Sequence, residues 1–283
     1  MTIRFIPRLD VKGSSLVKGI NLEGLRVLGE PSIFAKYYYE YGADELIYQD
    51  VVASLHKQNT ILDLIEATAK EIFVPLTVGG GVQLADDIKK ILNAGADKVS
   101  INSAAIKNPE IINDFAEIFG SSTIIITIET LEIDNEYYAF TDNGRVNSGK
   151  KVTDWIEEVQ LRGAGEIILT SIKNEGKGKG SNQSLFQNLK DKVNIPFLNH
   201  GGFGSLDHIE TAVKNGIDGI VLSSMLHYDF LSNKMNISKV KEGNQDFLKS
   251  GEQSNRFEKI SLPQIKKKLL EKGYNVREWL KLE

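Results

Sequence analysis

The sequence contains no cysteine among its 283 residues. This absence excludes disulfide bonds, thiolate metal ligands and any cysteine nucleophile. Histidine is scarce too: His56, His200, His208 and His227 are the four histidines, and they show no paired spacing of the zinc-site kind. We therefore expect neither a structural nor a catalytic metal, and the sequence indicates no cofactor.

Long apolar runs and a strong excess of one charge are also missing. No stretch approaches the roughly 20 apolar residues of a membrane helix, and the start MTIRFIPRLD lacks an apolar core of signal-peptide length. The net charge of −4 gives no electrostatic reason to expect nucleic acid or an anionic membrane as a partner. With 41% hydrophobic and 25% charged residues, the composition is typical of a soluble globular protein, which we expect to be cytoplasmic.

A glycine-rich segment occurs twice in the chain. Residues 79–88, GGGVQLADDI, reappear as HGGFGSLDHI at 200–209, an offset of 209 − 88 = 121 positions. At the same offset, the Asn-Ser pair at 102–103 reappears as Ser-Ser at 223–224. A period this long with only two copies indicates two half-domains rather than a solenoid.

Short β-branched runs alternate with longer amphipathic stretches, the pattern that builds a parallel sheet. Strands are predicted at residues 4–9, 45–49, 74–78, 98–101, 123–128, 166–170, 196–199 and 219–222. Helices are predicted at residues 32–41, 59–72, 84–94, 108–119, 152–162, 185–193 and 206–215, with a last helix at 263–272. This α/β pattern, repeated four and four, predicts a (β/α)8 TIM barrel built from two duplicated half-barrels, and a doubly wound open sheet is the second choice.

The chain length allows one large α/β domain. We expect a single barrel over residues 1–283, with half-barrels of about 1–121 and 122–283. Residues 132–146 are polar and rich in turn residues, which predicts a hairpin inserted after the fifth strand. Residues 232–258 are dominated by polar side chains and are predicted to be a polar insertion before the last helix.

The repeated segments follow the carboxyl ends of strands, where this fold carries its active residues. Their glycines free backbone N–H groups to approach a ligand, and the hydroxyl or amide pair adds donors beside a helix N-terminus, an arrangement that binds phosphate. Two anion sites are therefore expected on opposite sides of one mouth, suited to a ligand with a phosphate at each end. The alternative is that the glycines only make tight turns. The predicted phosphate-binding residues are Gly80, Gly81, Asn102, Ser103, Gly201, Gly202, Ser223 and Ser224.

Asp10 and Glu129 end the first strand of each half. They are expected to face each other across the mouth, where two carboxylates can divide acid and base duties if their environments separate their pKa values. Alternatively, one or both are solvated or bridge to Lys12 or Lys18. Lys18 lies on the loop after Asp10, where a flexible cation could cover a bound phosphate, and an ordinary surface lysine is the equal alternative.

Four charged residues begin strands at the opposite end of the predicted barrel: Arg4, Glu45, Lys98 and Glu166. Two positive and two negative charges there could form a closed ring of ion pairs. From the residues alone we prefer a polar plug that seals the barrel floor, because buried charges need partners.

These residues resemble a known family, the cyclase subunit of imidazole glycerol phosphate synthase. The matching runs include IPRLDVK at 6–12, VKG at 17–19, TVGGG at 77–81, GADKVSIN at 95–102 and RGAGEIILTS at 162–171. The resemblance implies a half-barrel duplication, a class I glutaminase docked on the barrel floor, and ammonia passing through the barrel to a bis-phosphate substrate at the mouth.

By the same resemblance, Asp10 is the family's catalytic aspartate on the first strand. The four charged floor residues are all the members of the family's gate at the ammonia entrance, which reverses the preference for a plug. The absence of cysteine then gains a meaning, since this chain cannot hydrolyse glutamine by the usual thiol route. A partner must make the ammonia.

The departures from the family lie at the catalytic face. Glu129 replaces the family's second catalytic aspartate and is one methylene longer. The acidic loop after the sixth strand becomes KNEGKGK at 173–179, whose Gly176 joins the predicted phosphate-binding residues, and His200 replaces a small residue. With Arg8 before Asp10, this context resembles a paralogous branch associated with glycosyl amidation, in which a complex converts a sugar N-acetyl group to an acetamidino group for surface glycans.

We therefore predict an ammonia-conducting barrel subunit of a glutamine-dependent, lyase-type amidotransferase complex acting in glycosyl amidation. Its catalytic residues would be Asp10, Glu129 and Lys18, its substrate a phosphate-bearing small molecule, and a sugar amidotransferase a further partner. One alternative, favoured by Asp10, Lys18 and both anion sites, is the cyclase subunit itself in histidine biosynthesis. Another is a non-catalytic scaffold for a glutaminase.

Overall fold

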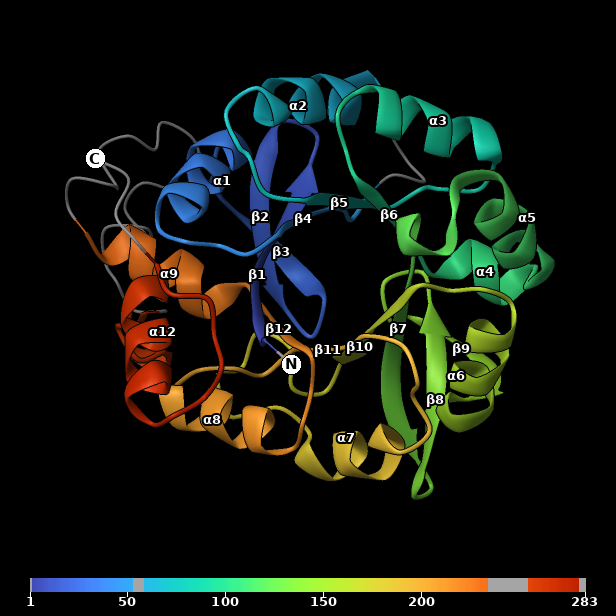
Figure 1. Cartoon of the computed structure of the whole chain (residues 1–283). Helices are drawn as coiled ribbons and strands as arrows, with labels where there is room; N and C mark the ends of the chain where they lie inside the picture. The colour runs from blue at the N-terminus through green and yellow to red at the C-terminus, as the bar shows by residue number, and fades with distance from the viewer. Residues whose placement is uncertain (1, 53–58, 234–253, 280–283) are drawn as a thin grey trace.

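Eight parallel strands close into a barrel in the computed structural model, which describes residues 2–52, 59–233 and 254–279 (Figure 1). Around the ring they are β1 (Arg4–Lys12), β4 (Leu46–Asp50), β5 (Leu76–Gly79), β6 (Lys98–Ile101), β7 (Ile124–Ile133), β10 (Glu166–Ser171), β11 (Phe197–His200) and β12 (Gly219–Leu222). In this order each strand pairs in parallel with the next, including β7 with β10, and β12 pairs in parallel with β1, so the sheet is closed. The predicted TIM barrel is confirmed and the open sheet was wrong.

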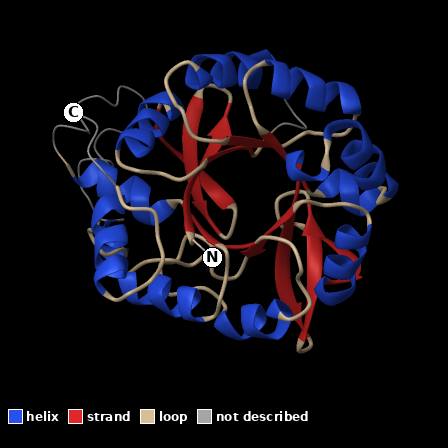
Figure 2. Cartoon of the chain, viewed as in Figure 1, coloured by secondary structure: helices blue, strands red, loops and turns tan. Residues whose placement is uncertain are grey.

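Helices surround the strands on the outside of the barrel (Figure 2). They are α1 (Pro31–Glu40), α2 (Asn59–Ala69), α3 (Ala85–Asn93), α4 (Ser103–Lys107), α5 (Glu110–Phe119), α6 (Val152–Leu161), α7 (Gln183–Lys190), α8 (Leu206–Lys214), α9 (Ser224–Ser232) and α12 (Leu262–Glu271), with short 3-10 turns η1 (Ser121–Thr123) and η2 (Ser254–Arg256). Helix α9 was not predicted. Its residues are buried on nearly every side, so it lacks the apolar stripe that reveals a surface helix.

Two antiparallel additions stand on the mouth side of the barrel. The hairpin of β2 (Ser15–Ile20) and β3 (Glu23–Gly29) follows β1 and was not predicted. The predicted insertion at 132–146 is larger than expected, because β7 continues out of the barrel and pairs with β8 (Glu136–Thr141), which pairs with β9 (Val146–Lys151). Its two turns, at 134–135 and 142–143, have the positive φ angles that Asp and Asn tolerate.

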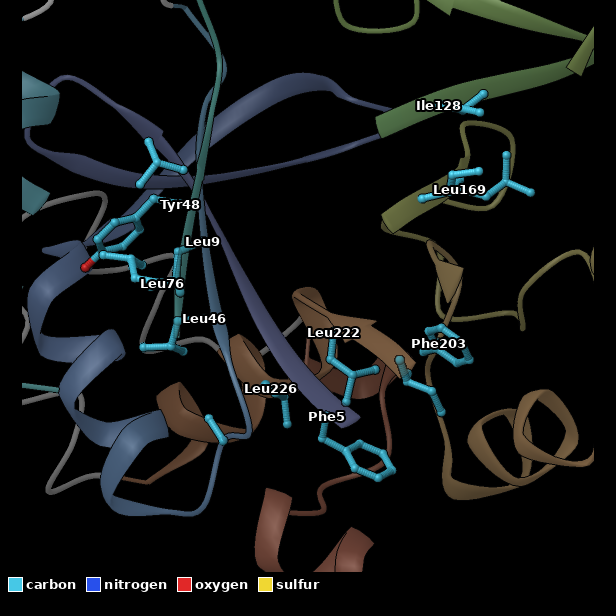
Figure 3. Close-up of a cluster of buried hydrophobic side chains, with 14 of the residues drawn as sticks. Phe5, Leu9, Leu46, Tyr48, Leu76, Ile128, Leu169, Phe203, Leu222 and Leu226 are labelled. Carbon is cyan, nitrogen blue, oxygen red and sulfur yellow. The ribbon is translucent and has the colours of Figure 1, made fainter. Parts of the chain in front are cut away.

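Alternation along the strands separates two apolar layers. Side chains such as Phe5, Leu9 and Tyr48 belong to the large core in which the outer helices pack against the barrel (Figure 3). A separate cluster of inward-facing aliphatic residues fills the barrel itself: Ile6, Ile47, Ile125, Ile168, Leu198 and Val221. Burying each of these side chains stabilises the fold by roughly 1.5–3 kcal/mol. The inner cluster also divides the barrel axis into a floor and a mouth.

Two predictions made from the sequence stay predictions, because the described residues do not test them. The polar insertion at 232–258 lies largely outside the described residues, which resume at residue 254. The half-barrel boundary near residue 121 stays a prediction. Within the described ranges, no helix combines the length and apolarity needed to cross a membrane.

Candidate functional site

At the barrel floor, the four predicted gate residues form a closed ring of ion pairs. Arg4 Nη1 lies 2.6 Å from Glu45 Oε1, and Arg4 also pairs with Glu166. Lys98 Nζ lies 2.9 Å from Glu45 Oε2 and 3.5 Å from Glu166 Oε2. Each cation thus bridges both carboxylates, and the pKa of Arg4 is raised because these two carboxylates outweigh its partial burial.

Hydroxyl groups continue the barrel interior toward the mouth. On the neighbouring strands β6 and β7, the Ser100 and Thr127 hydroxyls are hydrogen-bonded to each other at 2.5 Å. Both side chains are buried. The barrel axis therefore passes from a charged ring, through aliphatic side chains, to small hydroxyls before it reaches the carboxylates of Asp10 and Glu129.

At the mouth, Asp10 is held in a buried ion-pair network. Its Oδ1 accepts a hydrogen bond from Arg8 Nε at 2.8 Å, and its Oδ2 accepts one from Lys18 Nζ at 3.1 Å. Lys18 also pairs with Glu175, whose second oxygen accepts a hydrogen bond from the Leu22 amide at 3.1 Å. These contacts of Lys18 and Leu22 hold the β2–β3 hairpin against the mouth of the barrel. Lys18 is buried between two carboxylates, so the interpretation as an ordinary surface lysine was wrong.

The two carboxylates predicted to be catalytic, on Asp10 and Glu129, lie in different electrostatic environments. Burial raises the pKa of Glu129 to about 7, although Arg8 opposes this rise. Burial acts in the same direction on Asp10, but Arg8 and Lys18 outweigh it and hold the Asp10 pKa well below its usual range. Glu129 Oε2 has no hydrogen-bond partner among the described residues. At neutral pH, Asp10 is therefore ionised and Glu129 can gain or lose a proton, which is the separation that acid and base duties need.

The first predicted phosphate-binding set lines one side of the mouth. Gly80, Gly81, Asn102 and Ser103 border a cavity of about 400 Å³ that also reaches Glu129. Gly80 and Gly81 have φ angles of 101° and 72°, a conformation that favours glycine. The Asn102 amide donates to the Phe140 carbonyl, while its Oδ1 lacks a partner among the described residues.

The second predicted set borders a much smaller hollow. Its residues, with the neighbours His200 and Glu175, surround a space of about 20 Å³. The set comprises Gly176, Gly201, Gly202, Ser223 and Ser224. The residues of each predicted set thus lie together, one set in the first half of the chain and the other in the second half. Their phosphate-binding role stays a prediction.

Sequence reasoning missed two members of the mouth network. Arg8 precedes Asp10 by two residues on the same strand, so alternation alone places both side chains on one face. Glu175 gave no comparable signal, because its position depends on how the loop after β10 folds against the β2–β3 hairpin. Lys12, the other proposed partner of Asp10, is exposed, and no ion pair between them is found in the described structure.

Known proteins resemble this chain over most of its length. Residues 4–232 match the family described as Histidine biosynthesis protein. The Imidazole glycerol phosphate synthase subunit HisF of Legionella pneumophila is 47% identical over 206 residues, covering 72% of this chain and 97% of the relative. The HisF subunits of Natranaerobius thermophilus and Campylobacter concisus are each 41% identical, over 82% and 84% of this chain and 92% and 93% of the relatives. The chain therefore belongs to the histidine biosynthesis protein family, among its HisF-type cyclase subunits.

Proposed function

We propose that this chain is the barrel subunit of a two-component glutamine amidotransferase, which admits ammonia at its floor and consumes it at its mouth. The observation that carries the proposal is the order of groups along the barrel axis: an ion-pair ring, an aliphatic layer, then Asp10 and Glu129. An aliphatic layer admits neutral ammonia far more readily than ammonium, because a bare charge loses its hydration there. The ion-pair ring lies at the end of the barrel where ammonia would enter, and it would control that entry.

The floor also has the character of a docking surface for the proposed class I glutaminase. Tyr41, Phe73, Ile118 and Leu161 are exposed large apolar residues at the ends of outer helices or just after them, the end at which the next strand begins. Phe73 and Leu161 are 80% and 87% exposed. Several largely exposed apolar side chains at the same end of the barrel agree with a protein partner there.

Two reactions are candidates for the mouth. The names of the relatives favour the first, the cyclisation catalysed by imidazole glycerol phosphate synthase in histidine biosynthesis. In that reaction ionised Asp10 would act as a base and Glu129 as an acid, with Lys18 holding the hairpin over the substrate. The first cavity would bind a phosphate group through the Gly80 and Gly81 amides.

Glycosyl amidation is the second candidate, and none of the relatives compared above carries a name that supports it. It rests on the altered mouth: Arg8 paired with the catalytic Asp10, the longer Glu129, and His200 in the second hollow. A sugar amidotransferase would then be a further partner.

The decisive experiment supplies purified protein with ammonium and the bis-phosphate substrate of the HisF enzymes, and follows product formation. Turnover comparable to that of a HisF relative assayed in parallel establishes the first candidate. Turnover below about one hundredth of that rate, from a folded protein, overturns it.

Affinity capture of the tagged chain then identifies its partners. Capture of a glutaminase alone agrees with the first candidate, and capture of a glutaminase with a sugar amidotransferase agrees with the second. Capture of no glutaminase contradicts the two-component proposal.

A further inference from the structure

The two anion sites are unequal, although the repeat predicts them alike. The first cavity measures about 400 Å³ and the second hollow about 20 Å³. A cavity needs about 10–15 Å³ to hold one water molecule. The second hollow therefore has room for about one water molecule, far less than the first cavity offers to a phosphate group.

His200 accounts for the difference. Its counterpart in the first half is residue 200 − 121 = 79, which is Gly79. A Cβ atom on Gly79 would lie 2.5 Å from Gln49 Oε1 and 3.0 Å from Ser100 Cβ, so a side chain there would require these two neighbours to move. In the second half, Thr170 stands where Gln49 stands in the first, and its hydroxyl is hydrogen-bonded to His200 Nδ1 at 3.0 Å. The shorter threonine leaves space that the imidazole fills.

The imidazole also engages a residue predicted to bind phosphate. His200 Nε2 lies 3.4 Å from the Ser223 hydroxyl, and Ser223 corresponds to Asn102 of the first site. Burial, reinforced by the cations Arg8 and Lys18, holds the pKa of His200 well below its ordinary value. The ring is therefore uncharged at neutral pH and supplies no positive charge to an anion.

Among the described residues that line the second hollow, none adds a free cation. The Glu175 carboxylate borders the hollow and is almost fully buried. Lys18, which pairs with Glu175, is also paired with Asp10. A phosphate placed beside Glu175 would therefore meet a buried carboxylate whose neighbouring cation already has two anionic partners, and like charges at close range repel.

We infer that His200 is a specificity-determining residue that closes the second anion site to phosphate. The ligand of this mouth then carries one phosphate group, held beside Gly80 and Gly81, and is uncharged at its other end. This inference rests on the proposed function only in taking the mouth as the substrate site. It favours the second candidate reaction, because a bis-phosphate substrate needs both sites.

Inorganic phosphate tests the inference directly. Titration by calorimetry or phosphorus NMR should give one bound phosphate for the wild type and two for His200→Gly. This variant carries at position 200 the glycine found at the corresponding position of the first half. Asn102→Ala/Ser103→Ala should weaken the wild-type site at least about tenfold. His208→Ala is the matched control, since His208 does not border the hollow, and should keep one phosphate. Crystals soaked in arsenate should show a single anomalous peak beside Gly80 and Gly81.

Two bound phosphates in the wild type, or a folded His200→Gly protein that still binds one, would overturn the inference. If His200→Gly does not fold, the wild-type stoichiometry and the arsenate positions still decide. These measurements are independent of turnover and of partner capture. Failure of the single-phosphate inference therefore leaves the proposed function standing, and failure of the proposed function leaves the phosphate count unchanged.

Discussion

Each end of the barrel carries a cluster of opposite charges, but the two clusters differ in exposure and in balance. At the floor, the Arg4 and Lys98 side chains are 22% and 19% exposed and face two carboxylates. At the mouth, Arg8 and Lys18 are 3% and 2% exposed and share their surroundings with three carboxylates, on Asp10, Glu129 and Glu175. The floor is thus balanced and touched by water, whereas the mouth is buried and carries one carboxylate in excess.

This difference explains how the mouth separates the pKa values of Asp10 and Glu129, the two proposed catalytic carboxylates. A buried site magnifies the interaction between charges, so Arg8 and Lys18 keep Asp10 ionised while burial raises the pKa of Glu129 to about 7. Protonation of Glu129 removes the excess negative charge. At the floor, the cations and carboxylates are equal in number and water screens their ion pairs.

Asp10→Asn should have the largest effect. Turnover should fall by about 10²–10⁴-fold, because a positioned base is lost, and the free energy of unfolding should fall by about 3–5 kcal/mol, because Arg8 and Lys18 lose a buried partner. Ammonium-driven product formation and urea unfolding measure the two losses. Arg8→Met/Asp10→Asn is the control and should recover stability without recovering turnover. An unchanged rate in Asp10→Asn would remove this residue from the mechanism.

Glu129→Gln should change how stability depends on pH. Since the pKa of Glu129 is about 7 in the folded protein and about 4.3 in an unfolded chain, the folded state binds this proton more tightly. Its contribution to stability is present below about pH 4.3 and is lost as pH rises through 7, a loss of about 4 kcal/mol at 1.36 kcal/mol per pKa unit. Glutamine stays uncharged, so the variant should be about 4 kcal/mol more stable than the wild type at pH 8.

Urea unfolding at pH 5 and pH 8 measures that effect. Glu132→Gln, an exposed glutamate on the same strand, is the control and should leave the difference between the two pH values as in the wild type. If Glu129→Gln and the wild type are equally stable at pH 8, ionising Glu129 costs no free energy of folding. The proposed contrast in charge balance between the floor and the mouth would then fail.

The barrel and its floor were predictable from sequence because they depend on short-range patterns. Alternation along β1 places Arg4, Ile6, Arg8 and Asp10 on one face, and the repeat supplies the matching strands of the second half. The β2–β3 hairpin was missed because its turn contains Leu22, which has a φ of 64° and carries no turn signal.

The unequal anion sites could not be predicted in the same way. The sequence shows that His200 stands where the first half has a glycine. Whether its imidazole occupies the second anion site or lies outside it depends on the space beside Thr170. The burial of Lys18 likewise depends on Glu175, which reaches it from a distant loop. Side-chain packing between elements far apart in the chain decides both features.

Lys98→Met should have a smaller and more selective effect at the floor. Lys98 makes two of the ring's four ion pairs, so its loss opens the proposed entrance. Glutamine-driven turnover should fall about tenfold, equivalent to about 1.4 kcal/mol, while ammonium-driven turnover stays within about twofold. Lys36→Met, which breaks the exposed pair with Glu71, is the control and should change neither rate. If Lys98→Met also changes neither, the ring does not guard a conduit.

The smallest change in folding is expected at the apolar floor residues. Phe73→Ala and Leu161→Ala should each alter the free energy of unfolding by less than about 0.5 kcal/mol, because both side chains are largely exposed. Each should nevertheless weaken glutaminase binding measurably, by about 1 kcal/mol where the side chain enters the interface. Leu84→Ala is the matched control, since Leu84 is 65% exposed but follows the glycines at the mouth. Weaker binding by Leu84→Ala alone would place the partner at the mouth and reverse the roles assigned to the two ends.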